Sequence, residues 1–365
     1  MSIYIIAEAG VNHNGSPEMA LQLVDAAVQA GADAVKFQTF KATALVSESA
    51  PKAPYQKNST DANESQLDML RRLELSEETV KTLFAYCEKK QISFLSTPFD
   101  ETSLHFLVSD LGLRTLKLSS GEITNGPLIL RAAQSNCKII LSTGMSSLDE
   151  VQMALSVIAF GMIQSDEAPS KKAFQAAFSS KEGKALLREN VSLLHCTTAY
   201  PTPNNDINLR AMQTLADRFR QTVGLSDHTE GIIAPVAAAA MGAQIIEKHF
   251  TLDRNLPGPD HKASLEPDKL KDMIKNIRNT EIALGNGVKT LLPSEVENIT
   301  IARKSLIATE LIRSGEPFTP KNLGVKRPGT GISPMHYWSY IGKNASHDYP
   351  PGALIQSQNK NPDYE

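Results

Sequence analysis

The stretch IYIIAEAGVNHNGSPEMALQLVDAAVQAGADAVKFQ, residues 3–38, decides the fold. An apolar run over Ile3–Glu8 is followed by an amphipathic stretch over Glu18–Ala30 and by a second apolar run over Ala34–Gln38. Short apolar runs are typical of buried strands, whereas apolar residues spaced three and four apart are typical of helices. A strand, a helix and a strand in this order predict two parallel strands joined by a crossover helix.

The same alternation continues through most of the chain. Six further strands are predicted at Ser93–Thr97, Thr115–Leu118, Lys138–Thr143, Ser192–Thr197, Thr222–Ser226 and Gln244–His249. Helices are predicted between strands, for example at Ser76–Lys90, Glu101–Leu111, Leu148–Phe160 and Leu209–Phe219. Eight strands alternating with helices is the number that closes a (β/α)8 TIM barrel, so this α/β barrel is the predicted fold and a doubly wound open sheet is the alternative.

Two segments interrupt the alternation. Residues 41–71 are polar and contain KAPYQKNSTDANESQ. Because they follow the C-terminal end of a strand, we interpret them as an active-site loop. Residues 161–190 connect a helix to a strand at the opposite face, and their content of Lys, Ser, Ala and Glu predicts a solvated insertion without a catalytic role.

The chain changes character after the last predicted barrel helix, Glu266–Leu284. Pro and Gly become frequent, and short strands are predicted at Ser305–Ala308 and Leu323–Val325. The predicted domains are a catalytic barrel over residues 1–285, a linker over 286–294, a small β-rich domain over 295–354 and a polar stub over 355–365.

The composition excludes several classes of protein. Of 365 residues, 41% are hydrophobic and 21% are charged, which excludes a mainly disordered chain. The formal net charge of −3 argues against a dedicated nucleic-acid binder but leaves room for a small anionic substrate. No apolar run predicts a membrane span, and the N-terminus lacks the basic start of a signal peptide. Cys87, Cys137 and Cys196 are far apart, so we expect a reducing, cytoplasmic location and no disulfide framework.

Every predicted strand ends in polar or charged residues. Active sites of (β/α)8 barrels lie at the C-terminal ends of the strands, and a buried charge without a partner is costly. Polar ends that converge on one rim therefore predict a site there. The candidates are Glu8, Lys36, Gln38, Ser96, Thr97, Lys117, Ser119, Ser120, Glu122, Ser142, Thr143, His195, Thr197, Asp227, His228, Glu247, Lys248 and His249.

Two kinds of side chain at this rim indicate chemistry. Lys36 and Lys117 lie inside apolar strands, where a charged residue is unexpected because such strands are buried on both faces. With nearby hydroxyls the two lysines predict a pocket for a phosphate and a carboxylate. His228 and His249 follow neighbouring strands, which lie about 5 Å apart. Two imidazoles placed there either share a divalent metal ion or serve structural roles.

Two further features bear on the kind of site, namely the other histidines and the glycine-rich turns. His13, in the turn NHNG, and His195 are further candidate ligands, and the alternative role for His195 is that of an interior hydrogen bonder. The glycine-rich turns form neither GxGxxG nor GxxxxGK[ST], so nucleotide binding has no support.

Several segments carry a resemblance to a known family. In the barrel region they are IIAEAGVNHNG (5–15), DAVKFQTF (33–40), LSTPFD (95–100), LKLSSGEITNGPLI (116–129), IILSTGMSS (139–147), LLHCTTAYPTP (193–203), VGLSDHT (223–229) and IIEKHFTLDRNLPGPDHKAS (245–264). In the tail they are ARKSLIA (302–308) and VKRPGTGISP (325–334). With these segments the chain resembles the NeuB-like sialic acid synthases, which make nonulosonic acids from phosphoenolpyruvate and an N-acetylated mannose-type sugar. The tail is similar to the antifreeze-like (SAF) domain of that family.

The resemblance implies a set of site residues. Those expected to contact phosphoenolpyruvate are Lys36, Thr97, Lys117, Ser120, Ser142 and Tyr200. Those expected to contact the sugar are Glu8, Glu122, Tyr200, Asp260 and Arg327. His228 and His249 are the implied ligands of Mn²⁺ or Mg²⁺, with Co²⁺ as a further option. Glu122 is the candidate general acid/base, or alternatively it orients a sugar hydroxyl. Thr198 stands where some members carry Asn, which puts one enolpyruvate contact in question.

The resemblance also implies an activity and an assembly. The expected reaction condenses phosphoenolpyruvate with N-acetylmannosamine to give N-acetylneuraminate and phosphate. The alternatives are 2,4-diacetamido-2,4,6-trideoxymannose, giving legionaminate, and then a pseudaminate precursor. In the implied domain-swapped homodimer, Arg327 reaches the barrel of the other subunit. Two other classes stay open: a Schiff-base aldolase with Lys36 or Lys117 as nucleophile, and a non-catalytic glycan- or ice-binding module. No nucleic-acid or membrane partner is expected.

Overall fold

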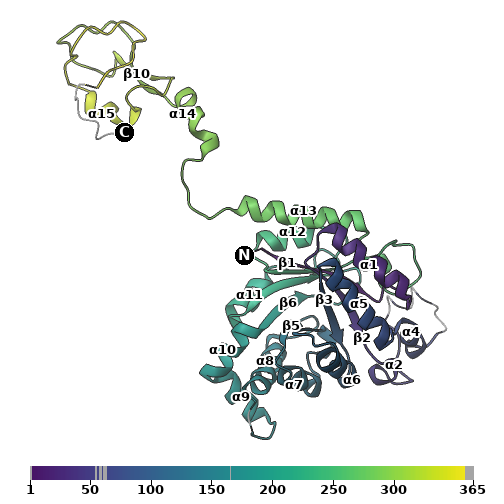
Figure 1. Cartoon of the computed structure of the whole chain (residues 1–365). Coiled ribbons are helices and arrows are strands. Elements are labelled where there is room, and N and C mark those ends of the chain that lie inside the picture. Colours follow the sequence, from purple (N-terminus) through teal and green to yellow (C-terminus); the bar gives the residue numbers. More distant parts are fainter. Residues whose placement is uncertain (1, 54–55, 57–59, 61–63, 165, 358–365) are drawn as a thin grey trace. The chain divides into compact units, whose positions relative to one another are not determined.

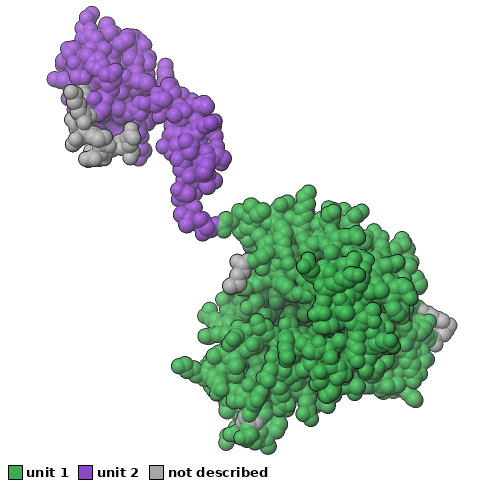
Figure 2. Space-filling model, viewed as in Figure 1, with its two compact units in different colours: residues 1–285 green, residues 286–365 purple. Residues whose placement is uncertain are grey.

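The computed structural model describes residues 2–53, 56, 60, 64–164 and 166–357. The chain divides into two compact units, Met1–Gly285 and Asn286–Glu365 (Figure 1, Figure 2). Parts of three predicted segments lie outside the described residues. They are residues 54–55, 57–59 and 61–63 of the polar segment, residue 165 of the segment 161–190, and residues 358–365 of the polar stub.

The first unit is a nearly closed barrel of parallel strands (Figure 1). The strands are β1 (Tyr4–Gly10), β2 (Ala34–Thr39), β3 (Ser93–Pro98), β4 (Thr115–Leu118), β5 (Lys138–Ser142), β6 (Val191–Cys196), β7 (Thr222–Asp227) and β8 (Ile245–His249). Their ladder runs in the order β3-β2-β1-β8-β7-β6-β5-β4, and the two end strands, β3 and β4, lie next to each other. The predicted (β/α)8 barrel is confirmed, and the open-sheet alternative is wrong.

Helices surround the strands (Figure 1). They are α1 (Pro17–Ala30), α2 (Ala42–Leu45), α4 (Gln66–Leu73), α5 (Glu77–Lys90), α6 (Glu101–His105), α7 (Gly126–Gln134), α8 (Leu148–Ile163), α9 (Lys171–Ser179), α10 (Lys181–Asn190), α11 (Ala211–Phe219), α12 (Ile233–Ala240) and α13 (Pro267–Leu284). Serine side chains begin several of them. Ser16 accepts from the backbone N–H of Met19 at the start of α1, and Ser147 forms a capping box with Glu150 at the start of α8. Within the described residues, no helix combines the length and the apolar character needed to cross a membrane.

Residues 161–190, predicted as a solvated insertion, are largely helical. α8 continues to Ile163, and α9 and α10 follow it and pack against it. Ala173 and Ala177 of α9 and Leu187 of α10 are buried. Exposed lysines and glutamates between these positions masked the helical period in the sequence. Because α10 leads directly into the start of β6, the segment lies away from the C-terminal ends of the strands.

The second unit has a small core of its own. β9 (Ser305–Ala308) and β10 (Leu323–Lys326) pair in antiparallel fashion, with α14 (Val296–Ala302) before them and α15 (Tyr337–Tyr340) after them. The buried residues of this core are Leu306, Ala308, Ile312, Phe318, Leu323, Ala345, Tyr349 and Ile355. The likeness of this unit to a SAF domain stays a prediction.

Gly224 marks a close approach of β7 and β8. A methyl group on Gly224 would lie 2.2 Å from the carbonyl oxygen of Ile245, a backbone atom that cannot turn aside as a side chain can. We expect Gly224→Ala to lower the free energy of unfolding by about 2 kcal/mol or more. Gly126→Ala is the control, because a methyl group there meets no atom within 4 Å beyond its chain neighbours. Urea unfolding compares the two variants, and equal stability would contradict the packing described for β7.

Candidate active site

Side chains that point into the barrel change from apolar to polar along the strands. The lower part of the lumen is filled by Ile6, Ala34, Leu95, Ile140, Leu194 and Ile245. Because side chains alternate along a strand, the residue two positions later points to the same side. Those residues are Glu8, Lys36, Thr97, Ser142, Cys196 and Glu247. A polar layer therefore lies above an apolar floor, at the C-terminal ends of the strands.

The polar layer lines a cavity of about 450 Å³. The predicted site residues on its wall are Glu8, Lys36, Thr97, Lys117, Ser120, Ser142, Tyr200, His228, His249 and Asp260. The segment interpreted as an active-site loop also reaches it, with Leu45, Val46, Ala53, Gln56, Gln66, Met69 and Leu70. The size and the mixed apolar and polar wall suit a small-molecule substrate.

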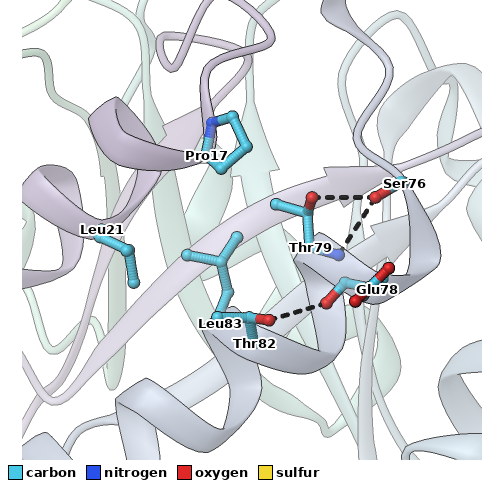
Figure 3. Close-up of a pocket in the computed structure, with 7 residues that line it drawn as sticks. All are labelled: Pro17, Leu21, Ser76, Glu78, Thr79, Thr82 and Leu83. Atoms are coloured by element: carbon cyan, nitrogen blue, oxygen red, sulfur yellow. Dashed lines mark hydrogen bonds between the residues drawn. The ribbon is translucent and has the colours of Figure 1, made fainter.

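A second hollow, of about 210 Å³, lies between α1 and α5 (Figure 3). The hydroxyls that line it are engaged in the helix itself. Ser76 accepts from the backbone N–H of Thr79 at 3.2 Å, and Thr82 donates to the carbonyl oxygen of Glu78 at 2.9 Å. The first contact caps α5 and the second lies within that helix, so these hydroxyls are already engaged and the cavity in the lumen is the candidate active site.

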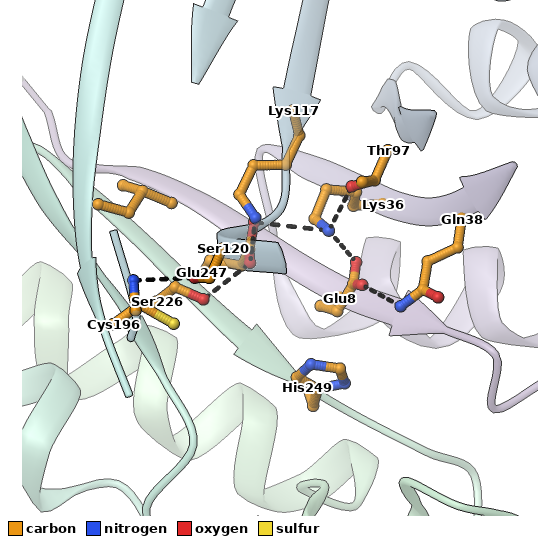
Figure 4. A network of polar contacts seen from close by, with 12 residues as sticks. Glu8, Lys36, Gln38, Thr97, Lys117, Ser120, Cys196, Ser226, Glu247 and His249 are labelled. Atoms are coloured by element: carbon orange, nitrogen blue, oxygen red, sulfur yellow. Dashed lines mark hydrogen bonds and ion pairs between the residues drawn. The ribbon is translucent and has the colours of Figure 1, made fainter. Parts of the chain in front are cut away.

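Four charged side chains form a buried network in the lumen (Figure 4). The Nζ atom of Lys36 lies 2.8 Å from Oε2 of Glu8 and 3.7 Å from Oε2 of Glu247. The other oxygen of Glu247, Oε1, lies 3.2 Å from Nζ of Lys117. Lys36 also donates to the hydroxyl of Thr97 at 3.1 Å. Glu247 thus joins the two lysines that the sequence placed in a phosphate and carboxylate pocket.

Burial and pairing set the protonation of this network. Burial raises the pKa of Glu8 to about 7, against the opposing effect of Lys36. Burial alone would also raise the pKa of Glu247, but Lys117, Lys36 and the hydroxyl of Ser226 lower it to about 2. Burial lowers the pKa of Lys117, although Glu247 opposes the shift. At neutral pH Glu247 is therefore ionised while Glu8 is partly protonated, which leaves positive charge for an anionic ligand.

Glu247 of this network, and Gln38 beside it, had no assigned role in the sequence analysis. Both were placed at the rim only, whereas in the structure Gln38 donates to Oε1 of Glu8 at 3.4 Å. The signal was the period of two along each strand. Glu247 shares a strand face with His249, and Gln38 shares one with Lys36.

His228 and His249 lie beside each other at the wall of the cavity, with ring centroids 5.3 Å apart. Nδ1 of His228 contacts the carbonyl oxygen of Thr197, an acceptor, so Nδ1 carries the proton. Nε2 of the same ring lies 3.0 Å from the hydroxyl of Tyr200. Burial alone would lower the pKa of His228, but Cys196 and the carbonyl group of Thr197 raise it. Among the described residues Nδ1 of His249 has no hydrogen-bond partner, and it is buried 3.9 Å from Oδ2 of Asp260. Burial, with His228 and other nearby positive groups, holds the pKa of His249 well below its usual range, so this ring is neutral.

The two imidazoles fit a divalent metal ion that takes two ligands from the protein. A carbonyl group on Nδ1 directs Nε2 of His228 outward in the arrangement usual for metal-binding histidines, and His249 offers a buried nitrogen without a hydrogen bond. Among the residues that the structure describes, no group of three or more His, Cys, Asp or Glu side chains could hold a metal. Further ligands would have to come from substrate or water, and the hydroxyl of Tyr200 would have to leave Nε2.

Glu122 and Arg327 are placed differently from the other predicted site residues. Glu122 belongs to a 3-10 turn, Ser120–Glu122, after β4, and it is not among the residues that line the cavity. Its Oε2 accepts from the amide of Asn125 at 2.7 Å, and burial raises its pKa. Arg327 belongs to the second unit, where it is exposed and its Nε donates to the carbonyl oxygen of Ala302 at 3.1 Å.

The two further histidine candidates have local structural contacts. His195 lies on the face of β6 opposite to Leu194, and its Nε2 bonds to the carbonyl oxygen of Ile207 at 2.6 Å. The interpretation of His195 as an interior hydrogen bonder agrees with this contact. His13 is buried, and its Nδ1 accepts from the backbone N–H of Gly15 at 3.0 Å, within the turn NHNG.

Comparisons with known proteins find relatives that span nearly the whole chain. The model of the NeuB family matches residues 23–289. An N,N'-diacetyllegionaminic acid synthase from Campylobacter jejuni is 49% identical over 96% of this chain and 98% of that protein. A protein of the same name from Legionella pneumophila is 43% identical over 97% of this chain and 94% of its own length. The solved structure of an N-acetylneuraminic acid (sialic acid) synthetase from Leptospira borgpetersenii, in complex with citrate, is 33% identical with a TM-score of 0.65, covering 82% of this chain and 90% of that one.

The raised pKa of Glu8 predicts a pH-dependent stability. Its pKa rises from 4.5 to about 7 on folding, so the folded state loses stability as the pH rises through this interval and the carboxyl must ionise. Glu8→Gln removes that loss. Between pH 4.5 and 7 we therefore expect the variant to gain stability relative to the wild type, by up to about 3 kcal/mol. This gain adds to a pH-independent cost of replacing the buried carboxyl group by an amide.

Urea unfolding in the presence of a chelator, repeated across this pH interval, measures the difference between Glu8→Gln and the wild type. Glu78→Gln, an exposed carboxyl on α5, controls for the change of residue type. Stability curves for Glu8→Gln and the wild type that run parallel over the whole interval would show that Glu8 titrates as an ordinary carboxyl.

Proposed function

The chain belongs to the NeuB family, and we propose that it is a nonulosonic acid synthase that joins phosphoenolpyruvate to an N-acetylated amino sugar and releases phosphate. The observation that carries this proposal is the lumen network. Glu247 holds Lys36 and Lys117 together on the wall that also carries His228 and His249. One cavity thus combines an anion site with a pair of imidazoles.

Phosphoenolpyruvate carries a phosphate and a carboxylate, and both need compensating charge. Lys36 and Lys117 supply it, since two buried ammonium groups are worth more to an anion here than at the surface. Hydroxyls on the same wall complete the site. The Oγ atom of Ser142 is buried and makes no hydrogen bond within the described structure, and an unsatisfied buried polar atom calls for a ligand.

In the proposed reaction, C3 of phosphoenolpyruvate attacks the aldehyde carbon of the open-chain sugar and forms the new C–C bond. Water then adds at C2, and the C–O bond to phosphate breaks as phosphate leaves. Two buried carboxyl groups on the wall suit the proton transfers, because burial raises the pKa of Glu8 to about 7 and that of Asp260 to about 6. Glu122 remains the third candidate and would have to exchange its bond with Asn125 for one to the substrate.

We infer that His228 and His249 hold a divalent ion, Mn²⁺ or Mg²⁺. Such an ion, when bound, supplies Lewis-acid polarisation of the aldehyde oxygen. The chain contributes the orientation of the ligands. The carbonyl group of Thr197 fixes the ring of His228, and Tyr200 stacks on that ring with centroids 4.1 Å apart.

The sequence analysis put N-acetylmannosamine first among the sugars, and two observations favour 2,4-diacetamido-2,4,6-trideoxymannose instead. The relatives at 49% and 43% identity are named N,N'-diacetyllegionaminic acid synthases. The loop side of the cavity is also apolar, with Val46, Met69, Leu70 and Phe99 on its wall. Methyl groups on both acetamido substituents and at C6 gain from such a wall, whereas the hydroxyls of N-acetylmannosamine do not. N-acetylmannosamine stays the second candidate because of the Leptospira enzyme.

We also propose a cytoplasmic homodimer in which Arg327 serves the barrel of the partner subunit. Cys87, Cys137 and Cys196 are free and buried, which supports a reducing location. In the second unit Met335 and Trp338 are 81% and 76% exposed, and exposed large apolar side chains mark interaction surfaces.

The proposed function is tested by supplying phosphoenolpyruvate, Mn²⁺ and each sugar in turn. We expect phosphate release and a product of the mass of diacetyllegionaminate with the diacetamido sugar, slower turnover with N-acetylmannosamine, and none without a sugar. A chelator should abolish the activity and Mn²⁺ should restore it. Inactivation by borohydride in the presence of pyruvate, without phosphate release, would instead indicate the Schiff-base aldolase. Full activity in metal-free protein would show that the reaction does not require a divalent ion.

The lumen lysines predict a selective effect on one substrate. We expect Lys117→Ala and Lys36→Ala to raise the Michaelis constant for phosphoenolpyruvate by about 10- to 100-fold, since a charge-assisted hydrogen bond contributes roughly 1.5–3 kcal/mol. The constant for the sugar should change less. Lys41→Ala is the control, because Lys41 pairs with Glu74 at 3.2 Å and does not line the cavity. An effect confined to the Michaelis constant for the sugar would show that the two substrates have been assigned to the wrong ends of the cavity.

The proposed dimer predicts complementation between two impaired variants. At a phosphoenolpyruvate concentration below the wild-type Michaelis constant, Arg327→Ala and Lys117→Ala would each lose most of their activity alone, but after subunit exchange a mixed dimer holds one intact site. Random exchange of equal amounts should restore up to about a quarter of wild-type activity. Mass spectrometry of isotopically labelled chains measures the exchange. Complete exchange without recovered activity would show that Arg327 does not serve the partner's barrel.

A further inference from the structure

One buried ion pair lies outside the cavity, and the proposed reaction does not use it. Asp227, at the end of β7, and Lys248, on β8, are paired directly across the two strands, and both side chains are 0% exposed. Leu225 and Ile246, two residues earlier on the same strand faces, belong to the apolar core between strands and helices. The ion pair therefore lies in an apolar layer, on the opposite side of the sheet from Glu247.

This pair closes the turn that carries His228. Nζ of Lys248 donates to Oδ2 of Asp227 and to the carbonyl oxygen of Thr229. The carboxylate of Asp227 also accepts from the backbone N–H of Thr229 at 2.9 Å and from its hydroxyl at 3.1 Å. His228 lies in the middle of the turn so formed, and His249 directly follows Lys248. One ion pair thus ties together the backbone next to both imidazoles.

Stability alone does not account for an ion pair at this position. Removing two charges from water offsets most of their attraction, and apolar replacements of buried ion pairs are often neutral or stabilising. The pair fixes the orientation of the turn. Its ammonium group holds a carboxylate and a backbone carbonyl group at defined positions, which an apolar side chain would not do.

We propose that Asp227 and Lys248 are positioning residues that fix the ring of His228 relative to the ring of His249. The consequence for activity rests on the proposed function, since the spacing of the two imidazoles acts through the ion that they would share. Groups that orient metal-binding histidines typically change metal affinity or activity by about 10- to 100-fold.

The double variant Asp227→Leu/Lys248→Met tests the proposal without leaving an unpaired buried charge. We expect a folded protein that binds Mn²⁺ at least about tenfold more weakly and has a kcat lower by a similar factor. The Michaelis constant for phosphoenolpyruvate should change little, because Lys36 and Lys117 stay in place. Electron paramagnetic resonance of free Mn²⁺ measures binding, and phosphate release measures turnover.

A readout in metal-free protein separates this proposal from the proposed function. In protein labelled with ¹⁵N-histidine, Nδ1 of His228 should appear as a single protonated nitrogen in the wild type, because it donates to the carbonyl oxygen of Thr197, and as a mixture of protonated and unprotonated nitrogens in the double variant. The signal is assigned with His228→Asn. If the wild type neither binds Mn²⁺ nor releases phosphate, the proposed function fails, and these ring shifts alone decide the positioning role.

The matched control is Asp33→Leu/Arg278→Met, which removes an ion pair of 2.7 Å at the other end of the barrel. It should change the melting temperature but neither the Mn²⁺ affinity nor the shifts of His228. Wild-type shifts, Mn²⁺ affinity and kcat in Asp227→Leu/Lys248→Met would overturn the proposal, whatever its melting temperature. If that variant does not fold, Thr229→Val takes its place by removing one donor to Asp227, and unchanged ring shifts would again overturn the proposal.

Discussion

A charge buried inside a protein needs a partner, and the candidate site depends on this constraint. Lys36, Lys117, Glu8 and Glu247 come from four different strands, so only the closed barrel brings their charged atoms to separations of 2.8 to 3.7 Å. Buried ion pairs add little net stability, because desolvation offsets their attraction. The network is better explained by a ligand. Under the proposed function, an anion in the cavity would pair with the two lysines, and Glu8, already partly protonated near neutral pH, is the carboxyl that is neutralised at the least cost.

The fold was predictable because each strand and helix has a recognisable pattern of apolar residues in its own segment of sequence. Apolar runs such as Ala34–Gln38 are buried on both faces, and a lysine inside one of them stands out. The site was only partly predictable, because its contacts are made between strands. Nothing near Glu247 in sequence shows that it joins two lysines from β2 and β4. The orientation of Glu122 depends on the amide of Asn125, which also begins α7, and no local pattern reveals that choice.

The period of two along β7 and β8 separates two tasks that adjacent residues perform. Glu247 points into the lumen and Lys248 points away from it, as Ser226 and Asp227 do on the neighbouring strand. The inner residues face the cavity, and the outer ones hold the backbone that presents His228. An analysis that treats the polar residues at each strand end as one cluster predicts the position of the site. It does not distinguish the residues that face the cavity from those that hold the backbone.

The two ends of the cavity are built from different kinds of structure, and this difference bears on substrate choice. The end proposed to bind the anion consists of strand residues. Lys36 has ladder partners on both sides, and Thr97 has one in β2. The opposite wall comes from the segment between β2 and α5, including Val46 and Met69, and loops accept change without disturbing a barrel. Under the proposed function, synthases that use phosphoenolpyruvate with different sugars are therefore expected to keep the strand residues and vary this wall. On that argument the apolar character of the loop side, rather than the lysines, is the feature of this chain that speaks for a sugar rich in methyl groups.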